Sequence, residues 1–376
     1  MINYNANEAT GGTVPSDPYY YESGESVTVA GNTGSLVNEG YVFDGWNTAA
    51  DGGGTDYAAG SSFAMGNANM ILYAKWNLPV HNITKDTYFS TIEAAITAAV
   101  EDDEIVVSPG TYEENIEFDN KNISLKSLDP LDPAIVAATI IDGGGDTDSV
   151  VRCIGGDSST INGFTIRNGN TSYGGGIYIN NASAPSITNN VITNNNATND
   201  GGGVFVFDNS TPTIEDNTIN CNEASYGGGI YVSDESYPII INNNITNNIA
   251  GSGGGIFVIW AGSSADIKNN TIDANLATTG NGGGICVGPN AVLVEDNTIS
   301  NNSANGNGGG IYAGQWATLK PTGDRPTGWG GKENIPVGDT LVPAEGIHYN
   351  IAGNVLWGNT HGNPLDYSVG AHVSFY

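Results

Sequence analysis

Short runs of alternating apolar and polar residues fill the chain from about residue 104 onward. Gly, Asn and Asp separate these runs, as on both sides of Ile177, Tyr178 and Ile179. Alternation bounded by turn residues predicts short β-strands with one buried face. The runs return at a nearly constant interval, which predicts a repeat architecture built from stacked coils.

Six Gly triplets set this interval. They begin at residues 174, 201, 227, 253, 282 and 308, so successive triplets lie 27, 26, 26, 29 and 26 residues apart. Each triplet is followed by Ile or Val. We expect the glycines to form a tight corner, because Gly adopts positive φ without a steric cost.

Three further columns emerge when the segments after the triplets are aligned. Two are Asn columns and one is an Ala column: Asn190, Asn217, Asn243, Asn270 and Asn297; Asn195, Asn222, Asn248, Asn275 and Asn302; Ala197, Ala224, Ala250, Ala277 and Ala304. In stacked coils equivalent positions lie ~4.8 Å apart along the axis, so their amides can bond to one another. We interpret the Asn columns as structural ladders that satisfy turn backbone groups, and not as ligand sites.

One helix is expected, over residues 90–100. Ile92, Ala95 and Ile96 share a face there, and Ser90 or Thr91 is placed to act as N-cap. The first coil would otherwise expose an apolar cross-section, so we expect this helix to cap it. The helix, the next strand and the sequence PGTY at residues 109–112 resemble the start of pectate-lyase-like β-helices.

The coils also resemble the GGA(I/V/L)-type repeats of polymorphic outer-membrane and adhesin-like surface proteins. The resemblance rests on runs such as GGGIY and NNTI within residues 160–313. It implies an all-β fold, with a right-handed parallel β-helix over residues 87–376. About eight coils would form a rod of ~40 Å.

A smaller β-rich module is expected over residues 1–77, followed by a linker at 78–86. Residues 26–29 and 70–76 alternate as strands do. The sequences GYVFDGWN and LYAKW resemble the Listeria–Bacteroides repeat, which implies a spacer module of bacterial and archaeal surface proteins. We interpret Trp46 and Trp76 as core residues of this module, with sugar-binding platforms as the alternative.

The charge balance limits the classes of partner that the chain can bind. Forty Asp and Glu against ten Lys and Arg give a net charge of -30, which excludes the basic footprint of a nucleic-acid-binding protein and disfavours anionic membranes. No apolar run is long enough to span a membrane. An acidic, Lys-poor surface favours an extracellular or cell-surface location. The N-terminus shows no signal-peptide pattern, so we expect a piece of a longer surface protein with other domains. Three widely spaced Cys allow at most one disulfide, and we expect them to be small buried thiols.

One column of the coils is aromatic and predicted to face outward. We define this aromatic ladder by the middle residues of the strands after the triplets, with Cys286 interrupting it: Tyr178, Phe205, Tyr231, Phe257 and Tyr312. Trp260 and Trp316 lie close in sequence and are candidates to extend it. Aromatic faces stack on sugar rings, so the ladder predicts a polysaccharide or cell-surface glycan as ligand. The alternatives are a ladder covered by another segment or one that stacks only for stability.

An insertion at residues 314–349 breaks the repeat and is the second candidate site. The first Asn column resumes only at Asn354, about one coil late. The insertion gathers charged and aromatic residues: Lys320, Arg325, Trp329, Lys332, Glu333 and His348. Long insertions in regular scaffolds often carry function, and a lid or a contact with another domain is the alternative.

No recognisable catalytic set accompanies these features. A polysaccharide lyase would need a basic residue on an exposed face, and outside the insertion the candidates in the coils are Arg152, Arg167 and Lys268. Lys268 is expected to pair with Glu295 instead. The Gly-His-Gly and Arg-Ile-Lys segments of polygalacturonases are absent. No cofactor is assigned, although residues 142–148 form either a Ca²⁺-binding loop or an ordinary acidic turn.

The leading hypothesis is a non-catalytic surface protein with an adhesin-like or carbohydrate-binding β-helix. The first alternative is a polysaccharide lyase or glycoside hydrolase whose site is built by the insertion. The second is a purely structural stalk without a ligand.

Overall fold

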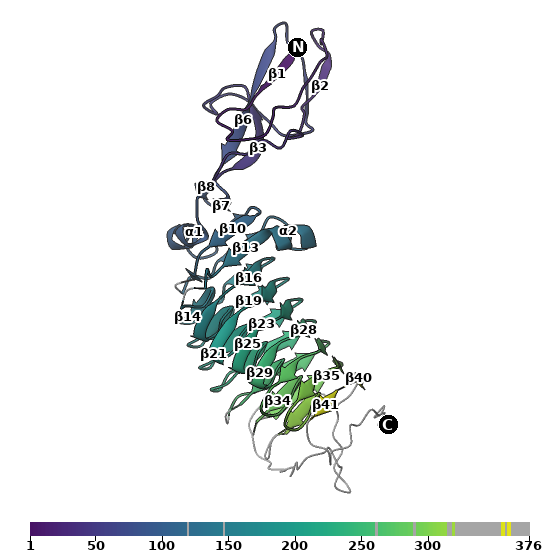
Figure 1. The fold of residues 1–376 in the computed structure, drawn as a ribbon. Coiled ribbons are helices and arrows are strands. Elements are labelled where there is room, and N and C mark those ends of the chain that lie inside the picture. Colours follow the sequence, from purple (N-terminus) through teal and green to yellow (C-terminus); the bar gives the residue numbers. More distant parts are fainter. Residues whose placement is uncertain are drawn as a thin grey trace. The chain divides into compact units, whose positions relative to one another are not determined.

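The computed structural model describes residues 1–118, 120–145, 147–259, 262–288, 291–313, 318–319, 355–357 and 359–361. The chain divides into two compact units (Figure 1). The first contains residues 1–82 and 86–91, and the second contains residues 83–85 and 92–376. Each unit is described by itself.

The first unit is a small β-rich domain. Its main sheet has the order β1 (Ile2–Asn5), β6 (Met70–Asn77), β3 (Val42–Asn47) and β4 (Asp56–Tyr57). A second pair joins β2 (Ser26–Thr28) to β5 (Ser62–Ala64). The segment expected as a linker contains β7 (Val80–Asn82), which pairs with β8 (Thr87–Phe89).

The two tryptophans of this unit stabilise its core. Trp46 is fully buried, and its indole N–H donates to the carbonyl oxygen of Ala30 at 2.8 Å. Trp76 is half-buried against the same core and donates to the carbonyl oxygen of Asn7 at 2.6 Å. Both indole N–H groups are therefore satisfied inside the domain. The interpretation as a core residue is confirmed for Trp46, whereas Trp76 packs against the edge of the core and its interpretation stays a prediction.

The second unit stacks coils of up to four strands, whose parallel sheets we number in chain order within a coil. Sheet 1 contains β9 (Glu104–Val107), β12 (Ser124–Ser127), β15 (Thr160–Asn162), β19 (Ser186–Thr188), β23 (Thr213–Glu215), β27 (Ile239–Ile241), β31 (Asp266–Lys268), β35 (Ala291–Glu295) and β39 (Thr318–Leu319). Sheet 2 contains β10 (Gly110–Glu113), β13 (Thr139–Asp142), β16 (Thr165–Arg167), β20 (Val191–Thr193), β24 (Thr218–Asn220), β28 (Asn244–Thr246), β32 (Thr271–Asp273), β36 (Thr298–Ser300) and β40 (Val355–Trp357).

The other two sheets complete the coil. Sheet 3 contains β17 (Asn170–Tyr173), β21 (Asn196–Asp200), β25 (Glu223–Tyr226), β29 (Ile249–Ser252), β33 (Leu276–Ala277), β37 (Ser303–Ala304) and β41 (Thr360–His361). Sheet 4 contains β11 (Ile116–Glu117), β14 (Val151–Ile154), β18 (Ile177–Asn180), β22 (Val204–Val206), β26 (Ile230–Val232), β30 (Ile256–Val258), β34 (Ile285–Val287) and β38 (Ile311–Ala313). Figure 1 shows these strands stacked coil upon coil. The prediction of a β-helix is confirmed.

The Asn columns form the corners on either side of sheet 2. At the second corner, the side-chain amide of Asn195 donates to the carbonyl oxygen of Ile166 at 3.1 Å, and its oxygen accepts from the backbone N–H of Gly169 at 3.0 Å. Its own backbone N–H donates to the side-chain oxygen of Asn222, one coil further on, at 3.1 Å. Asn195 therefore links three coils, and the structural interpretation of the Asn columns is confirmed.

The Gly triplets form the corner between sheets 3 and 4. Gly174 has φ +63°, a conformation that side chains disfavour. A Cβ on Gly175 would lie 2.6 Å from the carbonyl oxygen of Gly202 in the next coil. The corner is therefore too narrow for any side chain, and the residues of the Ala column are buried beside it.

Two helices lie near the first coils. α1 (Ile92–Ala98) lies within the segment predicted as a helix and buries Ile92, Ala95 and Ile96, while its role as a cap stays a prediction. The carboxylate of Glu114 accepts hydrogen bonds from the backbone N–H groups of Ile92 and Glu93, both at 2.9 Å, a contact that the sequence did not suggest. α2 (Pro133–Ala138), N-capped by Asp132, was not predicted. In the part of the chain that the structure describes, neither helix reaches the length of a membrane span.

The thiols only partly match their prediction. Cys153 and Cys286 are buried, but Cys221 is exposed and unpaired like the other two. Cys221 occupies the corner position directly before Asn222, where φ is +55°, so its side chain points away from the core. The expectation of three buried thiols is therefore wrong for Cys221.

Candidate functional site

The aromatic ladder lies on sheet 4, and its first four rings, from Tyr178 to Phe257, form a stack. The register of the strands places Tyr178, Phe205, Tyr231, Phe257, Cys286 and Tyr312 in one column. Ring centroids are 5.3 Å apart for Tyr178 and Phe205, 5.3 Å for Phe205 and Tyr231, and 5.8 Å for Tyr231 and Phe257, with interplanar angles of 8–14°. The predicted column is present, and its rings are nearly parallel.

Most of the ladder is buried. Phe205, Tyr231 and Phe257 are only 4–6% exposed and form one apolar cluster, with Tyr178 and Tyr312 partly buried against it. The rings in the middle of the column are covered by their neighbours above and below. The middle rings of the ladder therefore present little more than their edges to solvent. A ring face open to a ligand has to lie beside the ladder.

An ion pair precedes the ladder in the same column. The guanidinium of Arg152 lies 5.6 Å from the ring centroid of Tyr178 and pairs with the carboxylate of Glu117 at 3.2 Å. It also pairs with Asp148 at 3.1 Å. Arg152 thus covers the first ring with a cation, an arrangement that stabilises the stack.

Two exposed tyrosines flank the ladder on sheet 3. Tyr173 and Tyr226 are 42% and 47% exposed, respectively. Each packs one side against a ladder ring: Tyr173 lies 5.4 Å from Phe205, and Tyr226 lies 5.3 Å from Phe257, at interplanar angles of 50° and 46°. The ladder therefore contacts one side of both tyrosines, while much of each ring stays exposed to solvent.

Asp200 lies between these two tyrosines in the strand register. Its Cα pairs with Tyr173 on one side and Tyr226 on the other. In-register residues of a parallel sheet point to the same face, so the three side chains form a row, which we name the tyrosine strip. The two tyrosines are two coil rises apart, ~9.6 Å.

The carboxylate of Asp200 is half-buried and unpaired. Within the described ranges, no residue donates a hydrogen bond to its side chain and no cation pairs with it. Burial raises the pKa of Asp200 from 3.8 to about 6. A carboxylate in this state offers hydrogen-bond acceptor capacity that the described residues leave unused.

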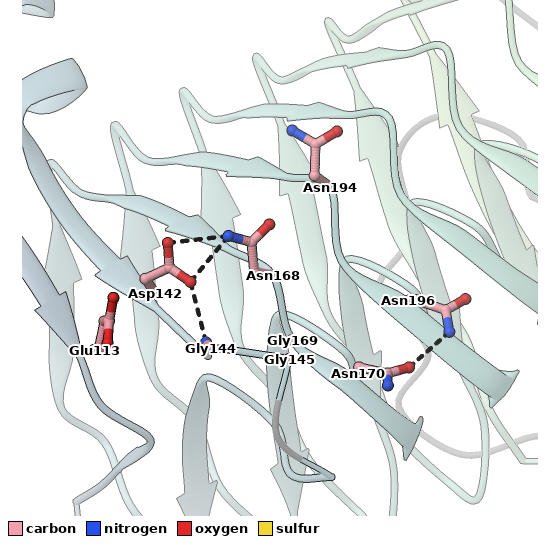
Figure 2. A pocket seen from close by; sticks show the side chains of 9 residues that line it. All are labelled: Glu113, Asp142, Gly144, Gly145, Asn168, Gly169, Asn170, Asn194 and Asn196. Atoms are coloured by element: carbon pink, nitrogen blue, oxygen red, sulfur yellow. Dashed lines mark hydrogen bonds between the residues drawn. The ribbon is translucent and has the colours of Figure 1, made fainter.

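A shallow depression of about 510 Å³ lies at the other end of strands β17 and β21 (Figure 2). Acidic and amide side chains surround it together with glycines: Glu113, Asp142, Gly144, Gly145, Asn168, Gly169, Asn170, Asn194 and Asn196. Figure 2 shows the amide of Asn168 turned toward Asp142, and the amide of Asn196 donating to Asn170 at 2.9 Å. Amides of this kind suit hydroxyl groups of a ligand.

The carboxylate of Asp142 is already hydrogen-bonded within the protein. It accepts hydrogen bonds from Arg167 at 2.7 Å, from Asn168 at 2.9 Å and from the backbone N–H of Gly144 at 3.0 Å. Burial alone would raise the pKa of Asp142, but these three donors outweigh it and hold the pKa below its usual value. Among the described residues, no three acidic, His or Cys side chains are placed to hold a metal ion, and the Ca²⁺ loop stays a prediction.

The basic residues that the structure describes all form ion pairs or hydrogen bonds within the protein. Lys268 pairs with Glu295 at 3.2 Å, as predicted, and Arg152 and Arg167 are held in the pairs given above. The remaining four also have partners: Lys75 with Asp44 and Asp56, Lys85 with Asp103, Lys126 with Glu104, and Lys121 with the carbonyl oxygens of Ile96 and Thr97. The other three basic residues of the chain belong to the insertion.

Several predicted site residues lie outside the described residues. These are the ladder candidates Trp260 and Trp316 and the insertion candidates Lys320, Arg325, Trp329, Lys332, Glu333 and His348. Their assignment as site residues stays a prediction.

Sequence reasoning missed the tyrosine strip, although a signal was present. Tyr173, Asp200 and Tyr226 each directly precede a Gly triplet, so they share one offset in the repeat. A buried serine column was also missed: Ser183, Ser210 and Ser236 each follow the last Gly of a triplet by seven residues. The strip mixes Tyr with Asp, so it forms no column of one chemical type in the sequence.

Comparison with known families agrees with both units. Residues 149–324 match the family described as right-handed beta helix region, and residues 1–75 match the Listeria-Bacteroides repeat domain. The chain matches these two families, one in each unit. It is therefore an all-β chain, in which a region similar to the Listeria–Bacteroides repeat precedes a right-handed β-helix in the sequence.

Two proteins of Evansella cellulosilytica are similar to parts of this β-helix chain. One, named "Putative Gly-rich membrane protein", is 32% identical over 104 residues, which cover 26% of this chain and 12% of that protein. The other, named "Putative membrane protein", is 38% identical over 76 residues, or 20% of this chain and 11% of that protein. The chain thus matches only about an eighth of these relatives' lengths. No solved structure matches it. Together the domains and relatives indicate a surface-type protein.

Proposed function

We propose that this chain is the carbohydrate-binding region of an extracellular surface protein and that it holds an extended polysaccharide along the tyrosine strip without cleaving it. The observation that carries the proposal is the pair of exposed rings, Tyr173 and Tyr226, on a rigid aromatic base. Each packs at a tilt against a ladder ring, Phe205 or Phe257, so little side-chain freedom is lost when a ligand stacks on it.

The spacing of the strip also favours an extended sugar chain. The two tyrosines are ~9.6 Å apart along the axis, since each coil rises one strand spacing. This length is similar to two linked pyranose rings in an extended polysaccharide. Alternate sugars could therefore stack on the two tyrosines, with the intervening sugar above Asp200.

The depression at the far end of β17 and β21 supports the same use. Asn170 and Asn194 are exposed there, and their side-chain amides carry both donors and acceptors. Sugar-binding sites combine a flat apolar platform with a few placed polar groups, and these strands carry both.

Two assays test the proposal. Affinity electrophoresis of the whole chain should show retardation by at least one member of a panel of soluble β-1,4-linked glucan, mannan, N-acetylglucosamine and glucosamine polymers. If none retards it, the binding function is wrong. Incubation with the polymer that binds should release neither reducing ends nor unsaturated sugars. Release of either would establish the alternative, a lyase or hydrolase whose site involves the insertion.

A further inference from the structure

The unpaired carboxylate of Asp200 indicates what kind of sugar the strip takes. Asp200 lies in register between two aromatic rings and is half-buried by its surroundings. A ligand that stacks across Tyr173 and Tyr226 would remove more water from this carboxylate. Such desolvation is unfavourable unless the ligand supplies hydrogen-bond donors or a positive charge.

Among the residues that the structure describes, no cation pairs with Asp200. Each of the seven basic residues in the described ranges is held by another carboxylate or by backbone carbonyls, as shown above. The whole chain carries a net charge of -30, which attracts cations and repels anions over the surface. Both the local group and the overall field therefore favour a positively charged ligand.

The flanking rings favour the same ligand. A cation near the face of a tyrosine is attracted by the ring quadrupole. Arg152 already makes such a contact with Tyr178, 5.6 Å from the ring centroid, at the start of the ladder. An ammonium group above Asp200 would lie between two tyrosines, with three N–H donors for one unpaired carboxylate.

We propose that the tyrosine strip binds a cationic amino-sugar polymer, whose ring faces stack on Tyr173 and Tyr226 and whose ammonium group pairs with Asp200. This inference rests on the proposed function and narrows its ligand class. A neutral sugar would satisfy Asp200 only through hydroxyl groups. An acidic polysaccharide would be repelled by it.

The test compares two short probes and two variants near neutral pH. The probes are β-1,4-linked hexamers of glucosamine and of N-acetylglucosamine, which share a backbone and differ in charge. Asp200→Asn removes the carboxylate and keeps the size of the side chain. Asp234→Asn is the matched control, because Asp234 is exposed on the turn after sheet 4 and its loss changes the net charge equally. Isothermal titration calorimetry gives each Kd.

The expected result is tighter binding of the glucosamine hexamer by the unmodified chain. Asp200→Asn should weaken that binding by about tenfold or more, the loss expected for one charge-assisted hydrogen bond, and should abolish the preference between the probes. Asp234→Asn should leave both unchanged. Equal small losses in the two variants would mean that the polycation binds the acidic surface without a site, which overturns the inference.

The other outcomes separate the inference from the proposed function. If the N-acetylglucosamine hexamer binds as well as the glucosamine hexamer, the cationic preference is wrong and carbohydrate binding stands. If neither hexamer binds and the polymer panel also fails, both proposals are wrong. Asp200→Asn removes an unpaired charge from a half-buried site, so it should fold, and circular dichroism checks this.

Discussion

Phe205 and Tyr231 stack across neighbouring coils with ring centroids 5.3 Å apart and planes only 8° apart. Their exposed fractions are 4% and 6%. Each ring therefore uses its flat faces to contact its neighbours in the column. The middle of the ladder acts as apolar packing on the outside of sheet 4, and the exposed tyrosines beside it are better placed to meet a ligand.

Truncating the ladder should destabilise the β-helix. We expect Phe205→Ala to lower the free energy of unfolding by about 3–5 kcal/mol, because it leaves a cavity between Tyr178 and Tyr231. Tyr237→Ala is the control, since Tyr237 is 50% exposed, and it should change stability by less than ~0.5 kcal/mol. Urea unfolding followed by far-UV circular dichroism measures both. Equal stability of the two variants would show that the ladder does not pack.

Substitutions in the Asn columns should also destabilise the β-helix. Asn243→Ala removes the acceptor for the backbone N–H of Asn217 at 3.0 Å and the donor for the carbonyl oxygen of Ile214 at 2.8 Å. Two buried backbone groups would lose their partners, so we expect a loss of about 2–6 kcal/mol. Asn244→Ala, at the next and exposed position, should cost little. Denaturant midpoints compare them, and a small effect at Asn243 would refute the structural interpretation of the column.

A methyl group at the Gly corner should not fit. In Gly202→Ala, the new Cβ would lie 2.5 Å from the carbonyl oxygen of Glu223 and 2.6 Å from that of Gly228, and both are backbone atoms. We expect a destabilisation of about 2 kcal/mol or more, seen as a lower Tm. Gly66→Ala, with open space around it and no positive φ, should leave Tm nearly unchanged. If the Tm of Gly202→Ala equals that of the unmodified chain, the corner is wider than the structure shows.

Asp200 should make stability depend on pH. Its pKa is about 6 in the folded chain, raised from 3.8 by burial. Between these values the unfolded chain has lost this proton while the folded chain keeps it, so the contribution of Asp200 to stability falls as pH rises and is constant above about 6. Asp200→Asn should therefore gain stability relative to the unmodified chain as pH rises from 4 toward 6. A stability difference that is independent of pH would contradict the assignment.

Much of the scaffold could be predicted from the sequence because its columns repeat. Gly, Asn and Ala recur at fixed offsets, and each recurrence has one physical cause, such as the corner at Gly174 or the amide bonds of Asn195. The helix at residues 92–98 was also predictable from its apolar face. α2 was missed, since Pro133–Ala138 is a single short insertion without a periodic pattern.

The candidate site was harder to predict. The alternation of Ile177, Tyr178 and Ile179 correctly indicated an outward aromatic column. It could not indicate that neighbouring rings bury one another, because this depends on their rotamers across coils. Tyr173 and Tyr226 are separated by Asp200 in their column, so no run of identical residues drew attention to them. Their exposure and their packing against Phe205 and Phe257 depend on the three-dimensional arrangement of neighbouring coils, which the sequence pattern does not reveal.

The central claim, that the tyrosine strip binds polysaccharide, is tested most directly by the affinity of the double variant Tyr173→Ala/Tyr226→Ala. Isothermal titration calorimetry with the best-binding polymer of the panel should show a Kd about tenfold to a hundredfold higher than that of the unmodified chain, since two stacking rings are lost. Tyr237→Ala removes an equally exposed tyrosine elsewhere and should leave Kd unchanged. An unchanged Kd in a folded double variant, or the same loss in both, would contradict the account.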